Sequence, residues 1–137
     1  MRLLLLEDNA DDALLFEDKA RRLLDAACVH VTPLGAAERF LATELPTGVV
    51  VDLRLPDGSG AKVVQRLVRF GAPLLIYSGC NEDDVVATAI DAGACGYLHK
   101  GATEIDFLAQ LCLLRGQSER TDAIRAAARA ALDRRQP

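Results

Sequence analysis

Five polar residues with chemically useful side chains each follow a short apolar segment: Glu7, Asp8, Asp52, Ser78 and Lys100. Together they offer three carboxylates, one hydroxyl and one ammonium group. Clustered carboxylates repel one another unless a cation lies among them. Mg²⁺ suits such a cluster because it prefers oxygen ligands and retains several waters. These residue types therefore predict a magnesium site, provided that the fold brings the five positions together.

A site of this kind could support phosphoryl transfer to a carboxylate. Asp52 could attack phosphorus and form an aspartyl phosphate. Such a transfer depends mostly on positioning and on neutralisation of charge. Lys100 could supply positive charge to the phosphoryl oxygens, and Ser78 could donate a hydrogen bond to one of them. We therefore predict that Asp52 is the phosphoacceptor and that Lys100 and Ser78 assist it.

Each residue also has an ordinary structural interpretation. Asp8 could cap the following helix, and an aspartate after an apolar strand is most often a turn residue. Ser78 before a glycine is an ordinary turn, and a lone lysine is usually solvated. The next acids, Asp11 and Asp12, are interpreted as first-turn residues that the helix dipole favours. The functional prediction therefore depends on the joint placement of all five residues.

The segments that must position these residues alternate between two kinds. Short apolar runs are typical of buried strands, and they fall at Leu3–Leu6, Val29–Val31, Val49–Val51, Leu74–Tyr77 and Cys95–Leu98. Longer segments with helical spacing lie between and after them, at Leu14–Leu24, Ala36–Leu41, Val63–Val68, Val85–Ile90 and Ile105–Cys112. Five such alternations predict a parallel sheet with helices on both faces. Ligands of such sheets bind at the carboxyl ends of the strands, where the five polar residues fall.

Turn residues support these boundaries. The stretch 56–60 is rich in Pro, Asp and Gly and is predicted as a loop. Gly93 is predicted to end the fourth helix. The last segment, Ser118–Arg135, is rich in Ala and Arg and is predicted to be helical.

Length and composition favour one soluble cytoplasmic domain. The chain has 137 residues, half of them hydrophobic, which is enough for a sizeable core. No apolar run approaches the roughly 20 residues of a membrane span, and the first run stops at Glu7, too early for a signal peptide. We therefore expect no membrane association.

The cysteines point to no metal centre. Cys28, Cys80, Cys95 and Cys112 form no C-x-x-C pair, so the zinc interpretation is weak. We expect reduced thiols, most of them small core residues, with Cys80 near the proposed site.

The charge distribution argues against general nucleic-acid binding. Residues 1–115 contain 17 acidic and 11 basic residues, whereas residues 116–137 contain 3 acidic and 5 basic residues. An acidic body does not suit nucleic acid, and the acids of the tail interrupt its positive run. We therefore expect protein partners, with residues 1–115 as the domain and 116–137 as a helical or partly disordered extension too short for an output domain.

Four motifs in order resemble the response-regulator receiver family of two-component signalling, of the single-domain type. Residues 3–9 (LLLLEDN) match the first strand and its acidic pair, and residues 49–60 (VVVDLRLPDGSG) match the phosphoacceptor strand and its loop. Residues 74–79 (LLIYSG) match the strand that carries the switch hydroxyl, and residues 92–100 (AGACGYLHK) match the last strand and its lysine. The resemblance covers about residues 1–115.

The resemblance implies a flavodoxin-like fold with strand order 2-1-3-4-5. It implies phosphorylation of Asp52 by a sensor histidine kinase or a phosphotransfer protein, and Mg²⁺ held by Glu7, Asp8, Asp52 and the backbone carbonyl of Arg54. Ser78 and Tyr97 would form the switch pair that alters binding to a downstream protein, and homodimer formation is plausible. The protein would catalyse only its own phosphorylation and dephosphorylation.

Two positions depart from the family pattern. Gly101 follows Lys100 where proline is common, so a cis peptide bond is not expected there. Arg54 and Cys80 occupy positions that flank the phosphoryl group in this family. Arg54 is large and cationic, so we expect it to screen the phosphoryl group from water and to slow dephosphorylation.

Two other functional classes stay open at this point. A phosphatase of the haloacid-dehalogenase type also uses a strand-end aspartate with Mg²⁺, but it resembles D-x-D, and Arg54 stands where the second aspartate would be. A pseudo-receiver would keep the fold as an interaction module and never be phosphorylated. Retention of the acids, the nucleophile and Lys100 argues against it.

Overall fold

A five-stranded parallel sheet forms the centre of the computed structural model, which describes residues 1–55, 58–79 and 82–135. The strands lie in the order β2-β1-β3-β6-β7, and they span Ala27–Val31, Arg2–Leu6, Gly48–Val51, Leu74–Ser78 and Gly96–His99. β6 and β7 are the fourth and fifth strands of this sheet along the chain, so the order is the expected 2-1-3-4-5. The predicted strands agree with the observed ones to within two residues, and the predicted fold class is confirmed.

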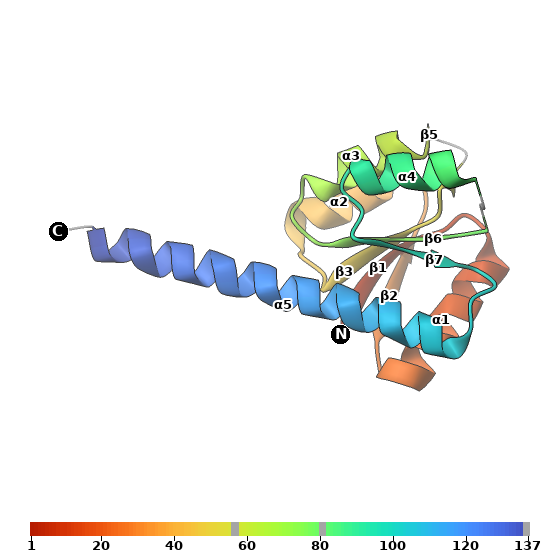
Figure 1. The fold of residues 1–137 in the computed structure, drawn as a ribbon, viewed down its shortest axis with the longest axis horizontal. Coiled ribbons are helices and arrows are strands. Elements are labelled where there is room, and N and C mark those ends of the chain that lie inside the picture. The colour runs from red at the N-terminus through yellow and green to blue at the C-terminus, as the bar shows by residue number, and fades with distance from the viewer. Residues whose placement is uncertain (56–57, 80–81, 136–137) are drawn as a thin grey trace.

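Helices cover both faces of the sheet, as Figure 1 shows, and the described residues form five of them. They are α1, α2, α3, α4 and α5, which span Ala10–Leu24, Leu34–Thr43, Ala61–Val68, Asp83–Asp91 and Glu104–Arg135. α2, α3 and α4 lie on one face, and α1 and the first half of α5 lie on the other. Gly93 follows α4 with a positive φ of 124°, the conformation that a helix-ending glycine supplies most readily.

The sheet divides the core in two because neighbouring side chains of a strand point to opposite faces. On β1, Leu4 and Leu6 pack with the helices α2, α3 and α4, whereas Leu3 and Leu5 pack with α1 and α5. All four leucines are buried. Burial on both faces explains why the strands of the sheet are continuous apolar runs without alternation.

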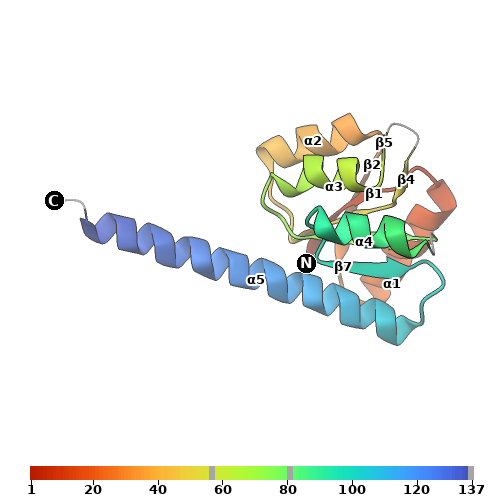
Figure 2. The same ribbon diagram turned by 45° about the horizontal axis from the view of Figure 1, so that its top comes forward.

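The helix α5 joins two segments that the sequence predicted as separate helices. It continues without a break through residue 135, so the predicted fifth helix and the predicted helical tail are one element that runs past the edge of the sheet (Figure 2). Phe107, Leu111 and Leu114 of its first half are buried against the sheet. Farther along, Arg125 Nη2 donates to the carbonyl oxygen of Gly71 at 3.4 Å.

Two short strands follow β3, and the second of them lies within the predicted loop, 56–60. β4 (Arg54–Leu55) and β5 (Gly58–Ser59) pair in antiparallel register, Arg54 opposite Ser59. Pro56 and Asp57, also assigned to that loop, lie outside the described residues, as does Cys80. In the described part of the chain, the cis peptide bond joins Thr32 and Pro33.

The expectation that most cysteines are core residues is wrong for those the structure describes. Cys95 and Cys112 are exposed and Cys28 is intermediate. Cys95 lies just before the edge strand β7, and Cys112 lies on the outward face of α5, which explains their exposure. All three are free thiols. No helix in the described ranges is both long and apolar enough to cross a membrane.

Close packing of α5 on the sheet generates a stability prediction. A Cβ atom at Gly48 would lie 2.4 Å from Leu114 Cδ2, and Leu114 is fully buried. We therefore expect Gly48→Ala to lower the free energy of unfolding by about 1–3 kcal/mol through overpacking. Urea unfolding measures this change.

Gly116→Ala is the matched control because a Cβ at that helical position would meet no described atom within 4 Å beyond its chain neighbours and its own helix backbone. It should leave stability unchanged or raise it by up to about 1 kcal/mol, since alanine is the better helix former. Equal effects of the two substitutions would contradict the proposed close contact.

Candidate functional site

The carboxyl ends of four strands meet at one edge of the sheet. β1 is followed by Glu7 and Asp8, β3 by Asp52, and β7 by Lys100, while Ser78 is the last residue of β6. The Asp52 N–H donates to the carbonyl oxygen of Leu6, at 3.2 Å, which ties the ends of β1 and β3 together. The sheet thus brings all five predicted site residues to one edge.

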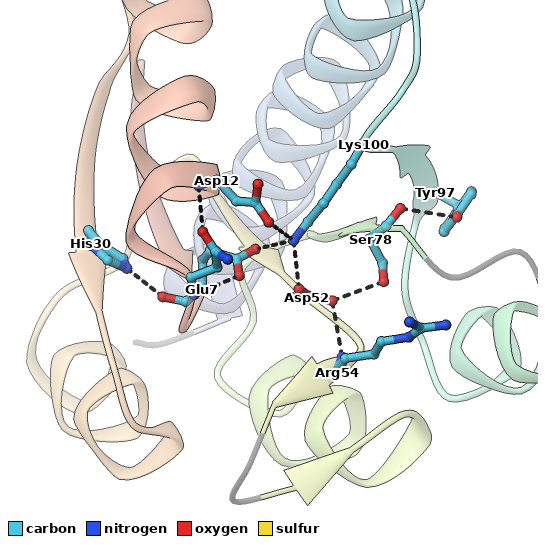
Figure 3. Close-up of polar contacts among 9 residues, drawn as sticks. Glu7, Asp12, His30, Asp52, Arg54, Ser78, Tyr97 and Lys100 are labelled. Atoms are coloured by element: carbon cyan, nitrogen blue, oxygen red, sulfur yellow. Dashed lines mark hydrogen bonds and ion pairs between the residues drawn. The ribbon is translucent and has the colours of Figure 1, made fainter.

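Asp52 is buried, with 6% of its surface exposed, and both of its carboxylate oxygens are engaged (Figure 3). Oδ1 accepts hydrogen bonds from Ser78 Oγ at 2.9 Å and from the Arg54 N–H at 3.0 Å. Oδ2 accepts from Lys100 Nζ at 2.8 Å. The Asp52 carboxylate is therefore held in one orientation by a hydroxyl, a main-chain amide and an ammonium group.

Lys100 pairs with three carboxylates at once. Its Nζ lies 2.9 Å from Glu7 Oε2, 2.7 Å from Asp12 Oδ2 and 2.8 Å from Asp52 Oδ2. Burial lowers the pKa of Lys100, but the hydrogen bonds to the three carboxylates outweigh burial, so the pKa lies above its ordinary value. Lys100 is therefore a fixed positive charge at neutral pH.

A second group of contacts fixes Glu7. Its Oε1 accepts from the Asn9 N–H at 3.0 Å, and Asn9 Oδ1 accepts from the Asp12 N–H at 3.0 Å, which makes Asn9 the N-cap of α1. His30 Nε2, from β2, lies 2.5 Å from the Glu7 carbonyl oxygen. Both the side chain and the main chain of Glu7 are thus held by neighbours.

The pKa values of the two buried carboxylates, Glu7 and Asp52, are shifted in opposite directions. Burial raises the pKa of Glu7, and Lys100 offsets this only in part, so the pKa lies above its ordinary value. Burial also raises the pKa of Asp52, but hydrogen bonds from Lys100, the Arg54 N–H and Ser78 outweigh it, and the pKa lies below its ordinary value. Asp52 is therefore held ionised, whereas the charge of Glu7 is incompletely compensated.

The acidic cluster fits a divalent cation. Glu7, Asp8 and Asp52 each offer a carboxylate oxygen, and these oxygens lie within 4.8 Å of one another. Glu7 Oε2 is buried, and its contact among the described residues is the ion pair with Lys100 Nζ at 2.9 Å. Lys100 is shared with two other carboxylates and offsets the burial of Glu7 only in part. A buried charge that is incompletely compensated costs free energy, and a hard cation ligated by oxygen would remove that cost.

Ser78 ends β6, and Tyr97 lies on the adjacent strand β7. The Tyr97 hydroxyl donates to the Ser78 carbonyl oxygen at 3.3 Å, and the Lys100 N–H donates to the same oxygen at 3.0 Å. Ser78 is fully buried, whereas Tyr97 is partly buried. A shift of the Ser78 main chain would therefore alter the hydrogen bonds of both Tyr97 and Lys100.

The structure also identifies contacts that the sequence did not indicate. Asp12, interpreted as a first-turn acid, reaches Lys100, and Asn9 and His30 hold Glu7. The spacing of Asn9 before a helix could have identified a cap. No sequence signal could have identified Asp12 as a partner of Lys100, because that contact joins residues 88 positions apart.

Comparison with known proteins agrees with this geometry. The family model for the response regulator receiver domain matches residues 5–111. The KDP operon transcriptional regulatory protein KdpE of Escherichia coli is 38% identical over 60 residues, which is 43% of this chain and 27% of that protein. The chain spans about a quarter of the length of the curated relatives it matches.

Two solved structures show the same fold. The signal receiver domain of an HD domain-containing protein from Pseudomonas fluorescens has a TM-score of 0.81 and 17% identity, covering 89% of this chain and 91% of that one. The receiver domain of a sensor histidine kinase from Pseudomonas aeruginosa, with magnesium coordinated in its active-site cleft, has a TM-score of 0.74 and 20% identity, covering 84% and 97%. Because the family model matches most of the chain, residues 5–111 of 137, the chain belongs to the response regulator receiver domain family of two-component signalling.

Proposed function

We propose that the protein is a phosphoacceptor switch in which Asp52 receives a phosphoryl group from a histidine kinase or a phosphotransfer protein. The observation that carries this proposal is the arrangement around Asp52, which is buried and contacted by both Ser78 and Lys100, with hydrogen bonds that hold the pKa of its carboxyl below the ordinary value. A carboxylate oriented in this way can act as a nucleophile toward phosphorus. The same donors would lie beside the oxygens of the transferred group.

Glu7, Asp8 and Asp52 would hold Mg²⁺, and the backbone carbonyl of Arg54 is a further proposed ligand. When bound, the ion supplies charge neutralisation for the incoming phosphoryl group. Asn9 and His30 keep Glu7 in place. Lys100 then provides the positive charge that the protein itself contributes to the phosphoryl oxygens.

Phosphorylation would change the balance of contacts at this edge of the sheet. A phosphoryl group adds roughly −1.5 to −2 charge and three strong acceptors. Ser78 Oγ, which now donates to Asp52, would donate to the phosphoryl group, and Tyr97 would move with it because its hydroxyl bonds the Ser78 main chain. This shifts the population toward one of two conformations and so alters binding to a downstream protein.

We propose a receiver domain over residues 1–115 and an extension over 116–137. The proposed boundary lies inside the continuous helix α5. A change in the packing of the first half of α5 could therefore be transmitted along the helix to the extension. The proposed partners are proteins, without direct contact to nucleic acid.

The phosphoacceptor assignment predicts a single modification. Incubation with Mg²⁺ and acetyl phosphate should add the mass of one phosphoryl group to the wild type, measured by intact mass spectrometry. Asp52→Ala or a chelator should abolish the addition, whereas Asp11→Asn, on the exposed side of α1, should keep it. Modification of Asp52→Ala would contradict the assignment, and no modification under any condition would favour the pseudo-receiver.

Arg54 generates a prediction about the lifetime of the phosphoryl group. Its side chain is exposed, and its guanidinium points away from Asp52 (Figure 3). A phosphoryl group at Asp52 would attract this cation, which would then screen the acyl phosphate from water. Arg54→Ala should shorten the lifetime severalfold in a timed mass measurement, while Arg120→Ala on α5 should not. Equal lifetimes in wild type and Arg54→Ala would refute the screening role.

The raised pKa of Glu7 predicts a pH-dependent stability. A folded-state pKa above the ordinary 4.5 means that the folded protein favours protonated Glu7. The stability that Glu7 contributes is therefore fully present below pH 4.5 and is lost as pH rises through the folded pKa. Without metal at pH 7, Glu7→Gln should therefore raise the free energy of unfolding, and the gain should vanish below about pH 4.5.

Added Mg²⁺ should make wild type more stable than Glu7→Gln, since the ion stabilises only a protein that binds it. Urea unfolding with and without Mg²⁺ measures both effects, and Glu119→Gln on the exposed part of α5 is the control. A metal-free Glu7→Gln protein less stable than wild type at pH 7 would show that the Glu7 charge is fully compensated.

A further inference from the structure

The ammonium group of Lys100 contacts three carboxylates, which are of two kinds. Glu7 and Asp52 are buried and belong to the acidic cluster that fits a divalent cation. Asp12 comes from the first turn of α1, its side chain is 33% exposed, and it lies outside that cluster. Its contact with Lys100 Nζ, at 2.7 Å, is the shortest of the three.

Within the described ranges, the contact that the structure gives the Asp12 carboxylate is with Lys100. The N-cap of α1 is Asn9, which accepts from the Asp12 main chain, so the side chain of Asp12 is not needed there. Favourable interaction with the helix dipole would be supplied equally by Asp11 in the same turn. Asp12 differs from Asp11 in its direct contact with Lys100.

A divalent cation and Lys100 would compete for two of the same carboxylates. Glu7 Oε2 and Asp52 Oδ2 each lie within 3 Å of Lys100 Nζ. Like charges so close repel strongly in a partly buried site. When the cluster binds a cation, Lys100 must give up part of its contact with Glu7 and Asp52, and Asp12 is the remaining partner.

We propose that Asp12 is a positioning residue that retains Lys100 at the site when a divalent cation occupies the acidic cluster. This inference rests on the proposed function, because it concerns the same metal site and the same lysine. Asp12 gives the ammonium group a place to shift to, between α1 and Asp52, from which it can reach a phosphoryl group (Figure 3). Without Asp12, Lys100 would stay between Glu7 and Asp52 and oppose the cation.

The test is a Mg²⁺ titration of the unphosphorylated full chain by calorimetry, without any phosphodonor. Wild type, Asp12→Asn, Lys100→Met and the double variant form a cycle, and Asp11→Asn is the charge-matched control. If Lys100 keeps a fixed position, the effects of two charges on Mg²⁺ affinity add. A non-additive result therefore reports a Lys100 position that depends on Asp12.

We expect Asp12→Asn to lower the Mg²⁺ affinity in both backgrounds. The factor of loss should be about five times larger when Lys100 is present than in the Lys100→Met background. Asp11→Asn should show no such difference, and Asp12→Glu, which keeps the carboxylate, should restore most of the affinity. Circular dichroism of each variant checks folding. Equal effects of Asp12→Asn in both backgrounds would overturn the proposal, as would a wild type that binds no Mg²⁺.

Failure of this inference is distinguishable from failure of the proposed function. Additive effects in a wild type that binds Mg²⁺ and accepts a phosphoryl group would reject the role of Asp12 alone. Non-additive effects in a protein that accepts no phosphoryl group would support the role of Asp12 and reject phosphorylation of Asp52.

Discussion

The interaction on which the site depends is the contact of one ammonium group with three carboxylates at the edge of the sheet. Lys100 Nζ lies within 3 Å of Glu7, Asp12 and Asp52. It holds Asp52 ionised although that residue is buried, and it leaves Glu7 only partly compensated. The site therefore retains excess negative charge that a divalent cation would neutralise. Under the proposed function, the same lysine would be displaced from the carboxylates and would then be the cation available to a phosphoryl group.

The rest of the fold fixes the geometry of that contact. The strands are buried on both faces, so their registers leave little freedom to the residues that follow them. The end of β1 is tied to β3 through the Asp52 N–H, and the end of β6 is tied to β7 through the Ser78 carbonyl oxygen. The Ser78 carbonyl also accepts from Tyr97, so a movement at the site reaches the partly buried edge strand. A rigid sheet with a few adjustable side chains at its edge suits a switch better than a flexible pocket would.

Sequence reasoning was sufficient for what depends on local pattern and chain order. The five strands, their order and the residues at their carboxyl ends follow from apolar runs, turn residues and the resemblance to receiver domains. Sequence reasoning failed where long-range contacts determine the role of a residue, or where packing determines its exposure to solvent. Asp12 looked like a helix-dipole residue because nothing local indicates its contact with Lys100, and His30 has no pattern that places it against Glu7. Most cysteines were expected in the core because cysteine is usually buried, yet Cys95, just before an edge strand, and Cys112, on an outer helix face, are exposed.

The most direct test of this account is a structure with Mg²⁺ and beryllofluoride, which mimics a phosphoryl group on a carboxylate. The account predicts the beryllium on Asp52, the metal among Glu7, Asp8 and Asp52, and Lys100 Nζ between Asp12 and a fluorine atom. Ser78 Oγ should then donate to a second fluorine atom instead of to Asp52. Lys100 still paired with Glu7 and Asp52 beside an unmodified Asp52 would contradict the proposal that these residues form a phosphoryl-dependent switch.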